Sequence, residues 1–198
     1  MIDEFAKEYL HSELRETRQA MLWKLDGLGA YDVRRPLTPT GTNLLGLVKH
    51  LSVLESRYFG EVFDRPIPQP LPRWDDAAEP GADVWATEHE TREEITDRYR
   101  RAWEHADATI AALTIGSPGH VPWWPRPDVK LFNILVHMLT ETSRHAGHAD
   151  ILREQLDGST GTTAAHAAPR RDTAASEARL ATIERAAEAA AAKPDHHG

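Results

Sequence analysis

Four long runs of apolar residues recur at intervals of three and four positions along the first 158 residues, which is the spacing of one face of an α-helix. The runs cover residues 2–27, a segment with a Thr cap near Thr40 or Thr42 that continues to about residue 63, residues 87–113, and residues 128–157. No segment alternates apolar and polar residues with the period of two expected of a half-buried β-strand. The chain is therefore predicted to be all-α.

Two segments rich in proline separate these helices. DRPIPQPLPRWDDAAEPGAD spans residues 64–83, and TIGSPGHVPWWPRPD spans residues 114–128. Both are typical of irregular crossover loops, and four helices with long crossovers match a four-helix bundle. The residues predicted to face its core are Phe5, Tyr9, Leu10, Leu14, Met21, Leu22 and Leu25 in the first helix, Leu44, Leu47, Leu51, Leu54 and Tyr58 in the second, Ile95, Tyr99, Ala102, Trp103, Ala106 and Ile110 in the third, and Leu131, Ile134, Met138, Ala149, Leu152 and Leu156 in the fourth.

The composition changes after residue 158. Residues 172–193 are rich in Ala, Glu and Arg, and Leu180 and Ile183 are their only large apolar side chains. Alanine favours helix, but such a segment can bury little apolar area. We therefore predict a bundle over residues 1–158, followed by a linker and an Ala-rich C-terminal helix or tail over residues 159–198.

The overall composition excludes several classes of function. The chain has 198 residues, a formal net charge of −8 and no cysteine. The acidic balance argues against nucleic acid as a partner. Without cysteine, neither a disulfide, a thiolate metal site nor a cysteine nucleophile is available. The charged N-terminus and the lack of a long apolar run favour a soluble, cytoplasmic protein without a membrane partner.

The sequence LTETSRHAGHADILRE, residues 139–154, carries the residues that most resemble a functional site. Glu141 and His145 are four residues apart and His148 follows three later, so all three project to one side of a helix. His145 falls within the apolar stripe, and His50 borders the stripe of the second helix. A Glu near a core needs a partner, and facing helices of bundles commonly build metal sites. Periodicity alone leaves a metal site and a structural hydrogen-bond network equally open.

Two segments resemble the DinB-like superfamily. They are TPTGTNLLGLVKHLSVLESRYFGEVF, residues 38–63, and LVHMLTETSRHAGHADILREQLDG, residues 135–158. The resemblance spans about residues 4–158, and it is closest to the branch grouped with mycothiol-dependent transferases and with the N-terminal domain of maleylpyruvate isomerase. It implies a four-helix bundle with a divalent metal, zinc or nickel, held by three side chains.

The resemblance also assigns roles to residues. Carried over by position, the metal ligands are His50, Glu141 and His145, with Glu141 standing where most members have a histidine. His148 stands where many members have glutamine, which implies a role beside the metal or facing the substrate. Arg144 is considered for its position next to His145 and not because of the resemblance: it is predicted to pair with a carboxylate of the substrate or cofactor, or with Glu141. Four tryptophans in or beside the loops either wall a pocket or cap the core: Trp74, Trp85, Trp123 and Trp124.

The function implied is metal-dependent activation of a low-molecular-weight thiol, such as mycothiol, for S-transfer to a small electrophile or for its isomerisation. The thiol has to come from a cofactor, since the chain has none. Two alternatives use the same residues: a non-catalytic or stress-related metal-binding bundle, and a biosynthetic enzyme that reuses the site for another addition or cyclisation. The oligomeric state that we consider for this protein is a homodimer.

Overall fold

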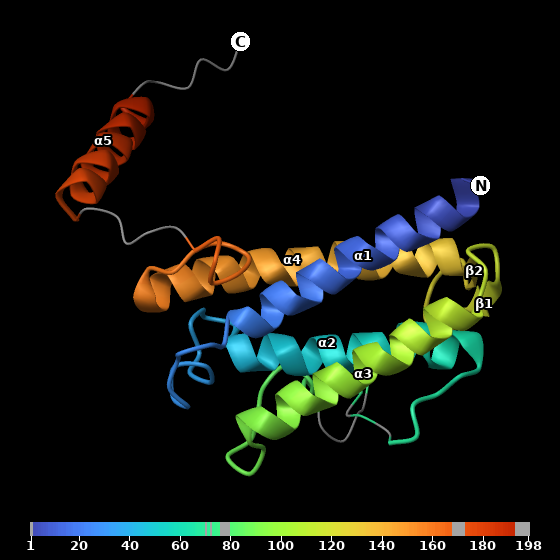
Figure 1. Ribbon diagram of the computed structural model, residues 1–198. Helices are drawn as coiled ribbons and strands as arrows, with labels where there is room; N and C mark the ends of the chain where they lie inside the picture. The colour runs from blue at the N-terminus through green and yellow to red at the C-terminus, as the bar shows by residue number, and fades with distance from the viewer. Residues whose placement is uncertain (1, 70, 72, 76–79, 168–172, 193–198) are drawn as a thin grey trace.

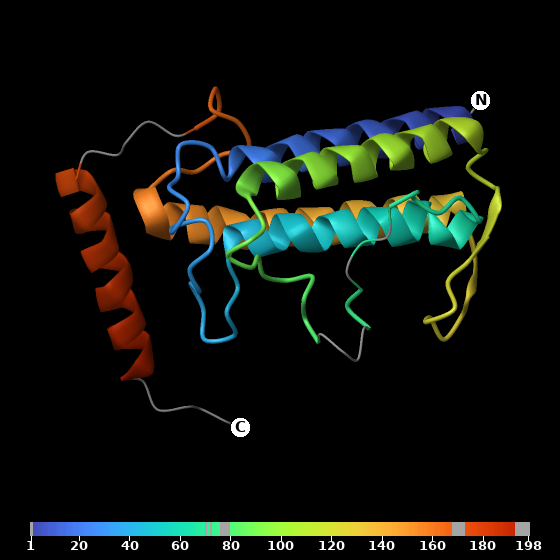
Figure 2. The same ribbon diagram turned by 90° about the horizontal axis from the view of Figure 1, so that it is seen from below.

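The protein is a bundle of four long helices in two layers, with a fifth helix apart from it (Figures 1 and 2). The computed structural model describes residues 2–69, 71, 73–75, 80–167 and 173–192. α1 and α4 form one layer, and α2 and α3 form the other. The predicted all-α bundle of four helices is confirmed. The elements are α1 (Ile2–Trp23), α2 (Leu44–Phe59), the short 3-10 helix η1 (Glu61–Phe63), α3 (Arg92–Ala112), β1 (Pro118–His120), β2 (Asp128–Lys130), α4 (Leu131–Asp157) and α5 (Thr173–Ala191).

Capping groups set helix ends that differ from the predicted ones. α2 is capped by Asn43, whose side chain accepts a hydrogen bond from the backbone N–H of Gly46, so the predicted Thr cap was wrong. α3 begins after Thr91, which forms a reciprocal capping box with Glu94, rather than near residue 87. At the C-terminal end of α1, the guanidinium of Arg153 donates to the carbonyl oxygens of Trp23 and of the following residue, Lys24, which satisfies acceptors that the helix leaves free.

The second crossover contains a small antiparallel hairpin that the sequence did not predict. β1 pairs with β2 through Pro118 and Lys130, Gly119 and Val129, and His120 and Asp128. Its strands have three residues each, which is too short for a period-two pattern to be recognised. The hairpin closes the bundle at the end where α3 leads into α4 (Figure 1).

The core lies between the two layers, and α2 is its centre. Every α2 residue from Leu44 to Phe59 is buried except His50, because α3, α4 and the crossover loops surround the helix. The predicted core residues Leu14, Ile95 and Met138 are also fully buried. Phe5 and Tyr9 were wrongly placed in the core, since 62% and 56% of their surfaces are exposed.

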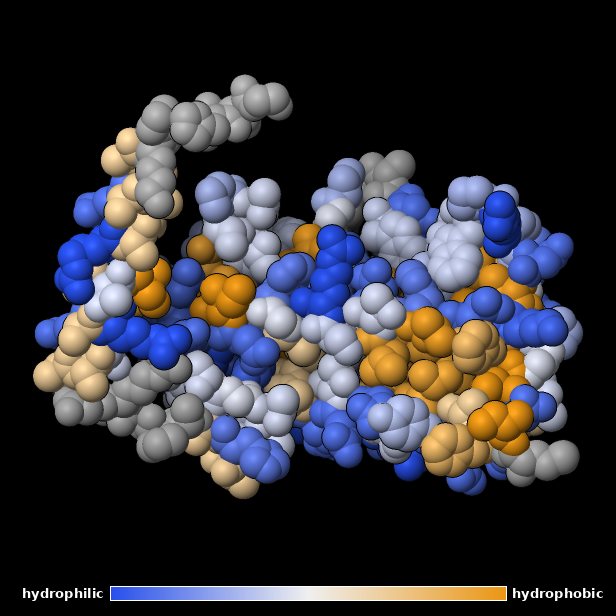
Figure 3. Space-filling view, turned by 90° about the horizontal axis from the view of Figure 1, so that it is seen from above, coloured by the Kyte–Doolittle hydropathy of each residue, from blue (hydrophilic) through white to orange (hydrophobic). Residues whose placement is uncertain are grey.

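The exposed side of the α1/α4 layer carries an apolar area near the N-terminal end of α1 (Figure 3). The exposed large apolar side chains of these two helices are Ile2, Phe5, Tyr9, Phe132, Val136 and Ile151. α5 buries little, since Leu180 and Ile183 are both more than half exposed. The domain boundary at residue 158 stays a prediction. In the described part of the chain, no helix is long and apolar enough to cross a membrane.

Candidate functional site

A pocket of about 480 Å³ opens between α2, α4 and two loops. This volume lies in the range of small-molecule sites. Two helices supply the histidines, and the loops supply hydroxyl groups and an indole. Its lining residues are Thr40, Gly41, Thr42, Asn43, Leu47, His50, Val84, Trp85, His145 and His148.

Of the three residues predicted to hold a metal, His145 lies next to both His50 and Glu141. The rings of His50 and His145 meet edge to face, with centroids 5.1 Å apart. Nε2 of His145 lies 3.6 Å from Oε2 of Glu141, which is too long for a hydrogen bond. Two donors that bind one tetrahedral ion at about 2.1 Å are about 3.4 Å apart, so this separation suits a shared ligand better than a mutual bond.

His145 is held in its neutral form. Burial, and to a smaller extent the neighbouring His50, lower its pKa to about 4. A neutral imidazole is the form that binds metal ions. Its Nδ1 atom is buried and has no hydrogen-bond partner among the described residues. Such a group calls for a ligand or a water molecule.

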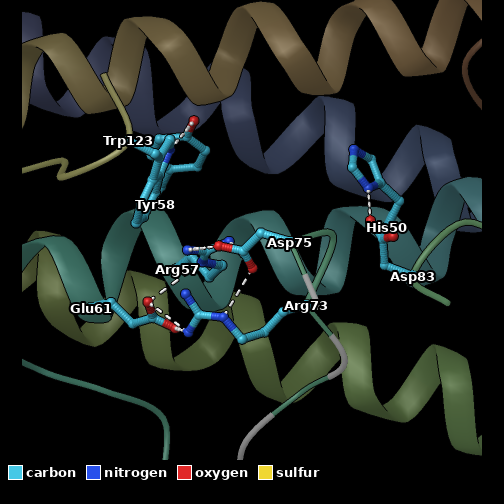
Figure 4. A network of polar contacts seen from close by, with 8 residues as sticks. All are labelled: His50, Arg57, Tyr58, Glu61, Arg73, Asp75, Asp83 and Trp123. Carbon is cyan, nitrogen blue, oxygen red and sulfur yellow. Dashed lines mark hydrogen bonds and ion pairs between the residues drawn. The ribbon is translucent and has the colours of Figure 1, made fainter. Parts of the chain in front are cut away.

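His50 is oriented by a carboxylate that the sequence did not reveal. Nδ1 of His50 donates to Oδ2 of Asp83 at 2.6 Å (Figure 4). Asp83 lies in the first crossover, and its side chain is 1% exposed. With the proton on Nδ1, the lone pair of Nε2 is free to bind a ligand. A carboxylate behind a histidine in this way is the usual second partner of metal-binding histidines.

His148 and Arg144 are more exposed than the three predicted ligands. His148 lines the pocket, and its ring centroid lies 5.6 Å from that of His145. Arg144 lies on the exposed side of α4, and in the described part of the chain it forms no ion pair with Glu141. The predicted roles of both residues stay predictions.

The four tryptophans divide between two places. Trp85 lines the pocket. Trp74, Trp123 and Trp124 instead surround Tyr58, whose hydroxyl accepts hydrogen bonds from the indoles of Trp123 and Trp124 at 3.2 Å each. The Arg57 guanidinium stacks between Trp74 and Trp123, 3.7 and 4.0 Å from the ring centroids. This second group caps the core.

The Arg57 group also holds the middle of the first crossover in place. Arg57 donates two hydrogen bonds of 3.2 Å to the carboxylate of Asp75, and Arg73 links Asp75 to Glu61 (Figure 4). His137 packs on Tyr58 in the same group, and burial lowers its pKa. His137 therefore belongs to the aromatic cap rather than to the pocket.

The side-chain chemistry of the three predicted ligands suits a divalent metal. Two neutral imidazoles and one carboxylate suit zinc or nickel. Among the residues that the structure describes, however, no three His, Cys, Asp or Glu side chains are placed so that they could hold a metal ion. The assignment of His50, Glu141 and His145 as ligands therefore stays a prediction.

Comparison with known families agrees with the fold. Comparison with the curated proteins finds no match. A family described as mycothiol S-transferase matches residues 9–158, which include most of α1, all of α2, α3 and α4, and every residue of the pocket. This match covers well over half of the chain. The chain belongs to the mycothiol S-transferase family, a DinB-like family.

Proposed function

We propose that this protein is a metal-dependent enzyme that activates a low-molecular-weight thiol of the mycothiol type. The activated thiol adds to a small electrophile by S-transfer, or serves its isomerisation. The observation that carries the proposal is the convergence of two histidines from different helices on one pocket, beside the carboxylate of Glu141. Membership of the mycothiol S-transferase family supports the choice of thiol.

The ligands proposed for the ion are His50, Glu141 and His145. When bound, a zinc or nickel ion supplies a Lewis acid that lowers the pKa of a thiol and yields a nucleophile near neutral pH. Two features of the structure keep a ring nitrogen of each histidine available to a metal ion. Burial keeps His145 neutral, and Asp83 holds His50 with Nε2 available. The side chains of His50 and His145 are 18% and 15% exposed, so little water competes for their nitrogens.

His148 and Arg144 are proposed to act on the reactants. His148 lies at the edge of the pocket, one turn beyond His145, where an imidazole can accept or return a proton. The exposed guanidinium of Arg144 is available for a carboxylate of the thiol or the electrophile. His148→Gln should therefore retain the metal and change turnover modestly.

The test combines metal content with thiol consumption. Protein purified without an affinity tag is analysed for metals and assayed with mycothiol, bacillithiol and glutathione against a generic electrophile, with and without chelator. We expect one ion per chain and turnover that the chelator abolishes. His145→Ala should lose both metal and turnover. The matched control is His89→Ala, because His89 is 88% exposed and touches only Glu88 by ion pairing in the described residues.

Two results contradict the proposal in different ways. Full metal content in His145→Ala would show that the ligand assignment is wrong. Tight metal binding without turnover of any thiol would instead identify a non-catalytic metal-binding bundle, or an enzyme that uses the site for other chemistry. The homodimer stays a prediction, which sedimentation analysis of the same preparation tests.

A further inference from the structure

Residues 81–85, with the sequence GADVW, form a short segment that we call the strap. The strap crosses α2 at the turn that carries His50. It lies between the proline-rich segment and the start of α3 at Arg92, and the sequence gives no local reason for it to contact α2. Three contacts hold it against the helix.

The first contact depends on a glycine inside α2. A Cβ atom at Gly46 would lie 2.0 Å from the carbonyl oxygen of Val84 and 2.8 Å from its carbonyl carbon. Backbone atoms cannot yield as a flexible side chain does, so any other residue at position 46 displaces the strap. A glycine in a helix interior is unfavourable unless close approach requires it. The close approach of Val84 is such a requirement.

The second contact is a buried lysine. Lys49, 4% exposed, donates from Nζ to the carbonyl oxygen of Trp85 at 3.0 Å and to the carboxylate of Glu90 at 2.8 Å. Glu90 also accepts from the backbone of Thr87 and from Arg98. The strap is therefore tied both to α2 and to the start of α3.

The third contact is the hydrogen bond from His50 to Asp83. The second oxygen of Asp83, Oδ1, is buried and has no partner among the described residues. A buried carboxylate with one unpaired oxygen contributes little to the stability of the fold, because removing the charged group from water costs free energy. The geometry points to a different use.

We propose that Asp83 is a positioning residue, and that the strap is docked on Gly46 and Lys49 in order to bring it to His50. Asp83 selects the tautomer with the proton on Nδ1 and fixes the plane of the ring, so that Nε2 is available on the pocket side. Trp85, two residues on, forms part of the pocket wall, so the same docking sets the wall and the histidine together. The role in metal binding rests on the function proposed above, whereas the tautomer does not.

The test reads the imidazole directly. Two-bond ¹H–¹⁵N spectra of the metal-free protein, taken at about pH 8 where imidazoles are neutral, distinguish Nδ1–H from Nε2–H tautomers. Wild type should show His50 with the proton on Nδ1. Asp83→Ala should remove this preference, and Gly46→Ala should do the same with the carboxylate still present. Gly147→Ala is the matched control, because it makes the same change in a helix where a Cβ meets nothing within 4 Å.

Metal titration gives the second readout. Zinc affinity should fall about 10- to 100-fold in Asp83→Ala and Gly46→Ala, and stay unchanged in Gly147→Ala. If wild type binds no metal but the tautomer responds as expected, the proposed function fails and the positioning role stands. An unchanged His50 tautomer in Gly46→Ala overturns the positioning role. The Gly46 variant decides the matter if Asp83→Ala does not fold.

Discussion

Replacing Arg18 with Met should destabilise the protein more than any surface substitution. Arg18 donates from Nε and Nη2 to the two oxygens of Glu55, and from Nη1 to Asp107, each at 2.7 Å. The side chains of Arg18 and Glu55 are 1% and 0% exposed. Burial alone would lower the pKa of Arg18, but the carboxylate of Glu55 more than offsets this and raises it. The pair is charged and fully desolvated.

The magnitude follows from the charge left behind. Arg18→Met leaves the Glu55 carboxylate without its partner in the core, and breaking a buried pair from one side costs about 3 to 5 kcal/mol. For a chain of 198 residues this corresponds to a fall in Tm of about 6 to 20 °C. Replacing both partners, as in Arg18→Met with Glu55→Leu, removes the unpaired charge. The double variant should recover most of the loss.

Urea unfolding of the two single variants and the double variant measures these free energies. The control is Arg100→Met, whose ion pair with Asp97 is about half exposed on α3 and should contribute less than about 0.5 kcal/mol. The reasoning is refuted if Arg18→Met loses less than about 1 kcal/mol. It is equally refuted if the losses of the two single variants simply add in the double variant, because the partners would then act independently.

Three further outcomes are expected. Tyr99→Phe should leave the free energy of unfolding unchanged or raise it by up to about 1 kcal/mol, because the Tyr99 hydroxyl is buried without a partner among the described residues; a clear loss in urea unfolding would show that the hydroxyl is satisfied. Burial would raise the pKa of Asp107, but the hydrogen bond from His11 and the guanidinium of Arg18 lower it to about 2. The Asp107 carboxylate therefore stabilises the fold fully above about pH 4, and this stabilisation is lost as the pH falls toward 2. Its contribution to the free energy of unfolding is about 1 to 2 kcal/mol after solvent screening. Asp107→Asn should flatten this part of the stability–pH curve. Removing residues 160–198 should leave a folded bundle. Its Tm should be slightly lower than that of a chain ending at residue 167, because the shorter chain loses the hydrogen bond from Lys24 to the carbonyl of Gly161. Loss of the cooperative transition would show that the tail belongs to the core.

Apolar periodicity predicted the four helices well and their environment less well. It identifies a single buried stripe, as in Leu44, Leu51 and Tyr58 of α2, because it assumes that the other face meets water. α2 is instead surrounded, so Lys49 and Glu55 on its polar face are also buried. Their partners lie 36 to 41 positions away in the sequence, and no local pattern contains that information.

The candidate site could likewise be predicted only in part from the sequence. Glu141, His145 and His148 could be predicted because they share one helix, where spacing fixes direction. His50 was a candidate because it borders the apolar stripe of its own helix, but its assignment as a ligand required the family resemblance. Asp83 could not be predicted, because it lies 33 positions from His50, in a crossover without regular structure. Its only sequence signal is indirect: a glycine inside α2, at position 46, where the helix by itself would favour another residue.

Helices supply the histidines of the pocket, whereas loops supply most of its walls. This difference affects which positions can change when the family evolves new substrates. Helix positions are fixed by a packed core, whereas loop residues can change with little effect on stability. Substitutions at Thr40, Thr42 and Trp85 would reshape the wall while the histidines keep their places. A directed-evolution library for new electrophiles should therefore vary these three positions and hold Asn43 and Asp83 constant, since one begins α2 and the other orients His50.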